Sequence, residues 1–398
     1  MKKRTIVAGI LAIAAVPLAF KLFEPVFTYE FGWTALPADV PVTTRDVADA
    51  RMARAATAAR TVLVAARQEL DAPAMSVAVA IDGQLAWRAV TGYADLEARV
   101  PADYDTAFRL GSTSKAVTAV AVGVLIDSGK IDVDQPIQSY VKAFPEKRWP
   151  VTLRQVMTHR AGIRDYGLCL CFPIWEHLNR RHFDSIDAAV ALVADAPLTF
   201  QPGTEFRYTS LGYNLTGAAI ETASGQRFDR YLRNAVFTSL GMTRSSVETK
   251  AGAGTGFYET RNREFKRAFA VDNSIRQPSG GIISTPTDMV RLGNVLLDDR
   301  LLSSATRKLL VTVPATGGAS AGARMYALGW RNSDWQLFGG KVTTRAYHHA
   351  GTAVGSTSVL VVLPEHRMVI SVMMNKGVES ADGLFAAADH ILEAFIER

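Results

Sequence analysis

Hydrophobic and polar positions follow a strand-like pattern near both ends of the chain. Residues 75–81 and 84–90 are mostly apolar, and Asp82-Gly83 between them is typical of a two-residue hairpin turn. Strand patterns return near the carboxyl end, at residues 326–332, 345–349, 356–363 and 368–375. We therefore expect one sheet to which both ends of the chain contribute.

The long stretch between these strands is mainly helical in pattern. Apolar residues recur there with helical spacing, and glycine or proline ends most of the segments. The predicted helices cover residues 112–128, 152–159, 184–196, 208–224, 228–240 and 284–297. Two further helices, 46–70 and 381–396, are predicted beside the strand-rich ends. A helical insert thus separates the two halves of the predicted sheet.

The composition is that of a globular protein large enough for two lobes. The 398 residues are 48% hydrophobic and 21% charged, with a formal net charge of +6. Basic residues form no cluster with interleaved aromatic residues, so we expect no nucleic-acid partner. The two cysteines, Cys169 and Cys171, are expected to be buried thiols, with a labile disulfide as the alternative, because a bridge between residues two apart is strained.

The amino terminus has the pattern of an export signal. Met1-Lys-Lys-Arg4 precedes an apolar run from Ile6 to Phe20, which is short for a full membrane span. Residues 1–27 are therefore predicted to be either a cleaved signal peptide or a membrane anchor, and residues 28–44 a linker. In both cases the body of the protein is expected to be exported, to the periplasm or another extracytoplasmic space.

Ser112 and Lys115, at the start of a predicted helix, are candidates for a nucleophile and its base. Residues three apart share a helix face, so the lysine amine points back toward the serine hydroxyl. Burial in this apolar helix would lower the pKa of the lysine and let its neutral amine accept the serine proton. The pattern alone is weak, because Ser139 and Lys142 share it and because a capping serine followed by a solvated lysine is the simpler explanation.

Three motifs in order resemble those of the serine β-lactamase-related proteins. Ser112-Thr-Ser-Lys115 matches the first motif, Tyr208-Thr-Ser210 lies at the Tyr-x-Asn motif, and His349-Ala-Gly351 matches the Lys/His-x-Gly motif. The superfamily includes class C β-lactamases, D-Ala-D-Ala peptidases, D-aminopeptidases and esterases. Residues 159–164 and 347–365 are most similar to its mitochondrial serine β-lactamase-like members.

This resemblance implies an α+β, β-lactamase/transpeptidase-like fold. An antiparallel sheet would be built from both chain ends, with flanking terminal helices and a mostly helical inserted lobe. Residues 45–398 would form the domain, with a sheet lobe at 45–108 and 321–398 and a helical lobe at 109–320.

The same resemblance implies the catalytic roles. Ser112 would be the acylated nucleophile, Lys115 its base partner and Tyr208 a second proton-transfer group. A phenol suits that role if the neighbouring ammonium lowers its pKa from about 10; otherwise Tyr208 is a buried aromatic residue at a helix start. The backbone N–H groups of Ser112 and Thr352 would form the oxyanion hole.

Ser210, His349 and Gly351 are the implied substrate-binding residues. Gly351 would permit close approach of the substrate to its strand. His349 stands where many β-lactamases have a lysine, and simple packing in the strand is almost as well supported as a direct role. Ser210 replaces the usual asparagine, and its shorter hydroxyl reaches less far toward a substrate amide, which argues against β-lactam binding.

A loop at residues 159–166 also resembles the family. Its polar residues are His159, Arg164, Asp165 and Tyr166. This loop would border the cleft, but we expect these side chains to serve in capping and loop packing.

We therefore expect a serine hydrolase that acts through an acyl-enzyme on a small-molecule, peptide or ester substrate, without a metal or organic cofactor. Membrane contact is expected only through an uncleaved amino-terminal segment, and the sequence specifies no oligomeric state. The alternative is a weak or inactive member that keeps the fold as a binding or assembly module. Ser210 supports that alternative, whereas the intact Ser112, Lys115 and Tyr208 oppose it.

Overall fold

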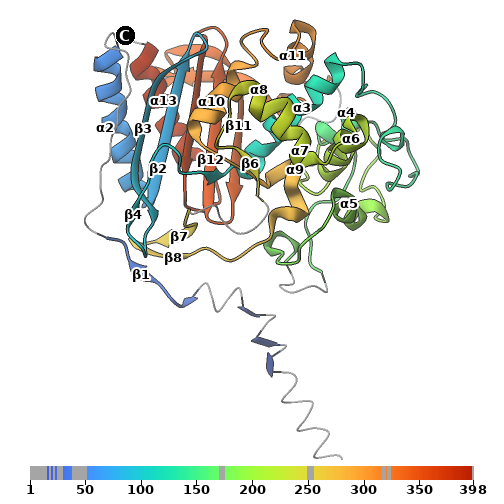
Figure 1. Ribbon diagram of the computed structural model, residues 1–398, viewed down its shortest axis with the longest axis horizontal. Helices are drawn as coiled ribbons and strands as arrows, with labels where there is room; N and C mark the ends of the chain where they lie inside the picture. Colours follow the sequence, from blue (N-terminus) through green and yellow to red (C-terminus); the bar gives the residue numbers. More distant parts are fainter. Residues whose placement is uncertain are drawn as a thin grey trace, which may run out of the picture.

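A seven-stranded antiparallel sheet forms the centre of the molecule (Figure 1). The computed structural model describes residues 16–17, 19–20, 23–24, 30–37, 52–169, 175–248, 255–315, 320 and 324–396. The strands follow the order β10-β11-β12-β13-β2-β3-β4. Their bounds are β2 Ala74–Ile81, β3 Gln84–Asp95, β4 Val100–Pro101, β10 Arg331–Leu337, β11 Val342–Ala353, β12 Ser356–Leu363 and β13 Met368–Met374.

The pairing of β13 with β2 joins the two ends of the chain. The register places Val372 opposite Val77 and Ile370 opposite Val79. At the predicted hairpin between β2 and β3, Asp82 and Gly83 have φ angles of 51° and 78°, the left-handed conformation that such a turn requires. The expected antiparallel sheet, built from both chain ends, is therefore confirmed.

Side chains of this sheet alternate between two cores, because successive residues of a strand point to opposite faces. Val77 and Val79 pack in one core with α2 (Ala53–Glu69) and α13 (Asp382–Ile396), which lie side by side (Figure 1). Ala78 and Ala80 face the other core, which the helical lobe fills. With both faces covered, β2, β12 and β13 are buried along their whole length, which explains their continuous apolar runs.

The helical lobe lies between β4 and β10 in the chain. Its α-helices are α3 Ser114–Asp127, α4 Leu153–Met157, α5 Ile186–Ala194, α6 Asn214–Ser224, α7 Phe228–Leu232, α8 Thr238–Leu240, α9 Gln277–Gly280, α10 Pro286–Asn294 and α11 Ser304–Val311. Short helical turns are η2 Gly111–Thr113, η3 Ile137–Ser139, η4 Glu176–Leu178, η5 Arg233–Phe237 and η6 Asn273–Arg276, and η7 Phe338–Gly340 follows β10. Gly129, Gly225 and Gly241 follow α3, α6 and α8 with φ of 67°, 69° and 65°, as expected for glycines that end helices.

Two small sheets accompany this lobe. One has the strand order β5-β9-β6, with β5 Phe108–Arg109, β9 Ile282–Ser284 and β6 Ser246–Val247. The other has the order β1-β8-β7, with β1 Thr34–Ala35, β8 Glu264–Arg267 and β7 Tyr258–Arg261. The mostly helical insert therefore also contains short strands, which the sequence pattern did not predict.

Two predicted element boundaries are wrong. The strand predicted from residue 326 begins only at Arg331, because residues 326–329 form a turn in which Gly329 has a φ of 77°. A Cβ atom on Gly329 would lie 2.7 Å from the carbonyl oxygen of Lys115, so this turn is pressed against α3. The helix predicted from residue 208 begins only at Asn214, for a reason that the candidate active site explains.

The amino-terminal segment contacts the body of the protein where a linker was expected. Thr34 and Ala35 form β1 and pair with Phe265 and Glu264 of β8. Most of the predicted signal or anchor lies outside the described residues, so that interpretation stays a prediction. No helix in the described ranges combines the length and the apolar character needed to span a membrane.

The first expectation for the cysteines, buried thiols, is wrong for Cys169: it is disulfide-bonded, which agrees with the alternative. The loop lies at the surface, where the neighbouring Leu168 is 68% exposed. Cys171 lies outside the described residues.

The contact between α13 and the sheet offers a test of the fold. Phe395 is fully buried, with its ring 5.9 Å from that of Trp87 on β3. We expect Phe395→Ala to lower the free energy of unfolding by about 3–5 kcal/mol, because it leaves a cavity in this core. Urea denaturation followed by circular dichroism measures the change. Leu85→Ala, at an exposed position of β3, is the control and should change it by about 0.5 kcal/mol or less.

Candidate active site

Ser112 lies in η2, the turn that leads into α3, and its position is held by the sheet. The Ser356 hydroxyl on β12 donates a hydrogen bond to the carbonyl oxygen of Arg109 (2.9 Å), and the Ser358 hydroxyl donates to that of Leu110 (2.7 Å). Ser112 lines a cavity of about 870 Å³ at the junction of the sheet and the helical lobe. Two side chains of β12 thus fix the backbone just before the candidate nucleophile.

Lys115 is completely buried, one helical turn after Ser112. Its Nζ lies 3.3 Å from the Ser112 Oγ, 3.2 Å from the Ser210 Oγ and 3.2 Å from the carbonyl oxygen of Ser279. These three oxygens are all neutral, and the structure gives Lys115 no ion pair with a described carboxylate. The solvated lysine considered from the sequence is therefore wrong, because the tertiary packing encloses the amine.

Burial lowers the pKa of Lys115 to about 7. The Asp165 carboxylate acts in the opposite direction, while the positive charges of Arg276 and Arg331 lower the pKa further. Near neutral pH a large fraction of the amine is therefore unprotonated. A neutral amine at hydrogen-bond distance from a hydroxyl can accept its proton, as general-base activation of a nucleophile requires.

Tyr208 lies over the lysine amine, with its ring centroid 4.6 Å from Nζ. The ring lines the cavity, whereas the hydroxyl oxygen is buried and makes no hydrogen bond of normal geometry within the described residues. Burial raises the pKa of this phenol well above its usual value, although the nearby Ser112 side chain acts in the opposite direction. The lowered phenol pKa considered from the sequence is therefore wrong, and Tyr208 is a neutral phenol at neutral pH.

The backbones of η2 and β11 are in direct contact beside Ser112. β10 pairs with β11 only as far as His348, so residues 349–353 extend beyond the end of β10. A Cβ atom on Gly351 would lie 1.9 Å from the Leu110 carbonyl oxygen and 2.7 Å from the Ser112 nitrogen. Gly351 is thus required for this approach. It brings Ser112 and Thr352 together in the cavity wall, an arrangement that suits a pair of oxyanion-binding amides.

His349 is buried and is bonded on both ring nitrogens. Nδ1 lies 2.6 Å from the carbonyl oxygen of Ala350, which can only accept, so Nδ1 carries the proton. Nε2 then accepts a hydrogen bond of 2.9 Å from the Tyr326 hydroxyl. Burial lowers the pKa of His349 well below its usual value, so the ring is neutral. Its side chain is not part of the described cavity lining, which favours the packing role over direct substrate binding.

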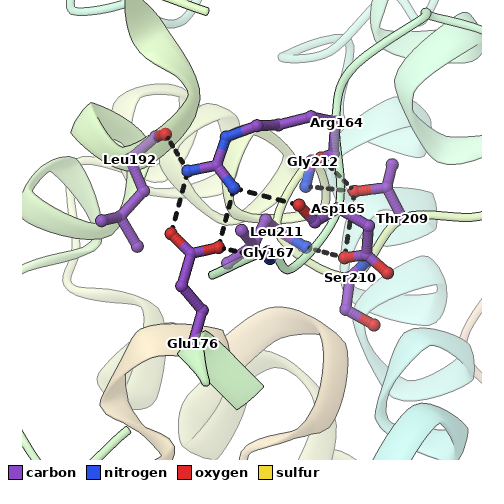
Figure 2. Close-up of polar contacts among 9 residues, drawn as sticks. All are labelled: Arg164, Asp165, Gly167, Glu176, Leu192, Thr209, Ser210, Leu211 and Gly212. Carbon is purple, nitrogen blue, oxygen red and sulfur yellow. Dashed lines mark hydrogen bonds and ion pairs between the residues drawn. The ribbon is translucent and has the colours of Figure 1, made fainter. Parts of the chain in front are cut away.

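The loop around Asp165 holds the Tyr208-Thr-Ser210 segment in place (Figure 2). One oxygen of the Asp165 carboxylate accepts hydrogen bonds from the backbone nitrogens of Ser210 (2.8 Å) and Leu211 (3.3 Å). The carbonyl oxygens of Ser210 and Leu211 accept hydrogen bonds from the nitrogens of Tyr213 and Asn214, three residues later. The chain therefore forms tight turns here in place of the helix predicted from residue 208, and α6 starts only at Asn214. The capping role expected for Asp165 is what the structure shows.

Arg164 and His159 stabilise the same region. The Arg164 guanidinium binds Glu176 at 2.7 and 3.0 Å and donates to the Leu192 carbonyl oxygen at 2.7 Å (Figure 2). His159 packs its ring 4.2 Å from that of Tyr208, and its Nδ1 accepts a hydrogen bond of 3.3 Å from the Thr209 nitrogen. Both side chains therefore pack and position the loop.

Three contributors to the site were not found in the sequence. Tyr326 binds His349, Arg276 lines the cavity beside Ser279, and Trp33 brings the amino-terminal segment into the cavity wall. None of these residues belongs to a motif with a recognisable spacing, so only the tertiary structure could show that they lie at the site. Within the described ranges, no group of three or more His, Cys, Asp or Glu side chains is arranged to hold a metal ion.

Comparison with known proteins agrees with this geometry. The sequence profile of the beta-lactamase family matches residues 45–394. The chain belongs to the beta-lactamase family. The serine beta-lactamase-like protein LACTB, mitochondrial, of Homo sapiens is 29% identical over 399 residues, with 79% of this chain and 73% of that protein covered. Penicillin-binding protein 4 of Amycolatopsis lactamdurans is 27% identical over 337 residues, with 80% and 84% covered.

A solved structure gives the same fold. The D-amino acid amidase of Ochrobactrum anthropi SV3, in complex with L-phenylalanine amide, has a TM-score of 0.71 at 22% identity, covering 86% of this chain and 99% of that one. The resemblance inferred from the three motifs is thus confirmed. As a member of the beta-lactamase family, the protein is a serine hydrolase.

The capping contacts of Asp165 can be tested by substitution. Asp165→Ala leaves the Ser210 and Leu211 amides without their acceptor, so we expect the free energy of unfolding to fall by about 1–3 kcal/mol. Urea denaturation measures the loss. Asp134→Ala is the control, because Asp134 is 62% exposed and pairs with Arg154 at the surface, where an ion pair contributes about 1 kcal/mol or less. Equal losses in the two variants would contradict the positioning role of Asp165.

Proposed function

We propose that this protein cleaves amide or ester bonds of a small-molecule or peptide substrate through an acyl-enzyme on Ser112. The observation that carries the proposal is the buried, partly neutral Lys115 amine 3.3 Å from the Ser112 hydroxyl. A lysine held without a carboxylate partner in a protein interior is costly. Its position beside a serine that lines a cavity provides a chemical reason for that cost.

Acylation follows from the groups around Ser112. The Ser112 Oγ attacks the substrate carbonyl and its proton passes to the Lys115 Nζ. The backbone amides of Ser112 and Thr352 bind the resulting oxyanion. When the bond to the leaving group breaks, the Lys115 ammonium returns the proton to the departing nitrogen or oxygen. The neutral Tyr208 phenol lies over the same amine. Its hydroxyl, which makes no hydrogen bond within the described residues, donates one to the leaving group at this step.

Deacylation uses the same groups in reverse order. Water attacks the ester carbonyl, and its proton passes to Lys115. The bond between the carbonyl carbon and the Ser112 Oγ then breaks, and the serine recovers its proton while the acid product leaves. No further reactant is needed for the cycle to balance.

The relatives favour an amide or peptide substrate. They include a protein named as penicillin-binding and a D-amino acid amidase. Ser210, in the place of the usual asparagine, donates no amide hydrogen to a substrate and accepts a hydrogen bond from Lys115. We therefore propose peptidase or amidase activity, with slow or absent turnover of β-lactams. Export, suggested by the basic and apolar amino terminus, is part of the same proposal.

Covalent labelling tests the nucleophile. We expect a fluorophosphonate to add once to the protein, at Ser112, in intact-mass spectrometry followed by peptide mapping. Ser112→Ala should abolish the adduct, and Lys115→Ala should slow its formation by at least about 100-fold, because the general base is lost. Ser139→Ala is the matched control, since Ser139 has the same spacing to Lys142. A folded protein that forms no adduct would contradict the proposal and favour a binding or assembly module.

The pH dependence of labelling tests the base. Because the neutral form of Lys115 accepts the proton, the rate should rise with pH, inflect near pH 7 and level off above it. Arg331→Gln removes a positive charge that lowers this pKa, so the inflection should move to higher pH. Arg345→Gln, which removes an exposed arginine paired with Asp334, should leave it in place. An inflection near pH 10, or a flat profile from pH 5.5 to 9, would exclude Lys115 as this base.

A further inference from the structure

We propose that Trp33 is a specificity-determining residue of this site and that it binds an apolar group of the substrate, far from the bond that is cleaved. This inference rests on the proposed function, because Trp33 lines the same cavity as Ser112. It adds that the substrate is extended and carries an uncharged, apolar group at its far end, which the motifs around Ser112 do not specify.

Trp33 lies outside the part of the chain that the family profile matches. That match covers residues 45–394, whereas Trp33 directly precedes β1 in the amino-terminal segment. The ring nevertheless forms part of the cavity wall. What this end of the cavity binds is therefore not determined by the motifs of the family and has to be argued from its own contacts.

The Trp33 ring is held in place before a substrate enters. Next to it, Thr34 pairs with Phe265 of β8. The half-buried ring lies under two cations, with the Arg261 guanidinium 4.2 Å and the Lys266 amine 4.4 Å from its centroid. A wall that is already ordered loses little conformational entropy when a ligand packs against it.

The cavity leads from the candidate nucleophile to this ring along the end of β11. Thr352 and Val354 both line it, and two residues of extended chain span about 7 Å. The next residue, Gly355, is in contact with the residue after β8, since a Cβ atom on it would lie 2.6 Å from the Cβ of Ala268. β8 in turn carries the contacts with Trp33. A substrate must therefore extend beyond about 7 Å from its reacting carbonyl to reach the ring.

The charges at this end of the cavity are already compensated within the protein. Three arginines of the wall are paired with carboxylates: Arg180 with Glu24 at 3.0 Å, Arg261 with Glu30 at 3.9 Å and Arg267 with Asp95 at 2.6 Å. Lys266 lies opposite Glu259 in the register of β7 and β8, where the two opposite charges attract each other. A charged substrate group would lose water here without gaining a free partner, which is unfavourable.

An apolar group fits the wall around Trp33. Ala268, Val354 and Val378 line the same cavity, and an indole ring offers a large apolar surface to a group that packs between them. Burial of such a group removes apolar surface from water, which is favourable. The geometry therefore favours an aromatic or branched aliphatic group at the far end of the substrate.

Two pairs of esters test this inference and show on which side of the cleaved bond the apolar group lies. The p-nitrophenyl ester of ω-phenylhexanoic acid carries a phenyl group on the acyl side, and p-nitrophenyl acetate is its short reference. ω-Phenylhexyl acetate carries the phenyl group on the leaving group, and ethyl acetate is its reference. We expect kcat/KM of the long ester to exceed that of its reference at least about tenfold in one of the two pairs. Titration of the released acid measures all four rates.

Substitution of Trp33 must remove that preference. Trp33→Ala should lower the ratio of kcat/KM between the long and the short ester about tenfold, and Trp33→Phe should keep a part of it, because a smaller ring remains. Trp149→Ala is the matched control: Trp149 is also a half-buried tryptophan under a cation, Arg148 at 4.6 Å, but it does not line this cavity. This control should keep the ratio. Thermal unfolding verifies that each variant is folded.

Two results would overturn this inference alone. They are equal kcat/KM values within both pairs of esters, and a preference that persists or grows in folded Trp33→Ala. Both leave the proposed hydrolase in place, because the esters are still cleaved through Ser112. If the protein cleaves none of the four esters faster than its Ser112→Ala variant does, the proposed function fails and this inference fails with it.

Discussion

The chemistry of this site depends on the burial of the Lys115 amine. Lys115 is inaccessible to solvent and has three neutral oxygens around its Nζ. Removal of water favours the uncharged form of the amine and lowers its pKa to about 7. The same desolvation would be a defect in an ordinary core, because nothing in the described structure neutralises the charge with an ion pair. Here it gives a base beside a serine hydroxyl.

The enclosure of this amine depends on segments that are far apart in the chain. α3 supplies Lys115, and 11 of its residues are buried. Ser112 lies in the preceding turn, η2. The Ser210 hydroxyl comes from the segment capped by Asp165, and the Ser279 carbonyl from α9. β12 anchors the residues before Ser112, and β11 passes so close to η2 that only glycine fits at position 351. The pairing of β13 with β2 makes this possible, because it unites the two ends of the chain in one sheet.

Local sequence signals predicted the regular parts of the fold. The Asp82-Gly83 turn and the glycines after α3, α6 and α8 adopt the positive φ angles expected of them, because these conformations depend on a few adjacent residues. The prediction failed where the local hydrogen bonds or a distant contact differ from those of a regular helix or strand. Before α6 the carbonyl oxygens of Ser210 and Leu211 bind nitrogens only three residues later, in tight turns, and the turn at Gly329 is set by its contact with α3. The hydrophobic periodicity of those segments predicts neither feature.

The sequence by itself determined the family, the mixed α+β class and the spacing that puts Ser112 and Lys115 on one helix face, because motifs and helix geometry are local properties. Only the tertiary structure decided the chemical state of the side chains. Enclosure makes Lys115 a partly neutral base and Tyr208 a protonated phenol, and the Tyr326 hydroxyl and the Ala350 carbonyl engage both nitrogens of His349. It also placed Trp33 in the wall of the cavity that contains Ser112. The physical reason is that desolvation and charge pairing depend on all the groups that surround an atom, and those groups come from every part of the chain.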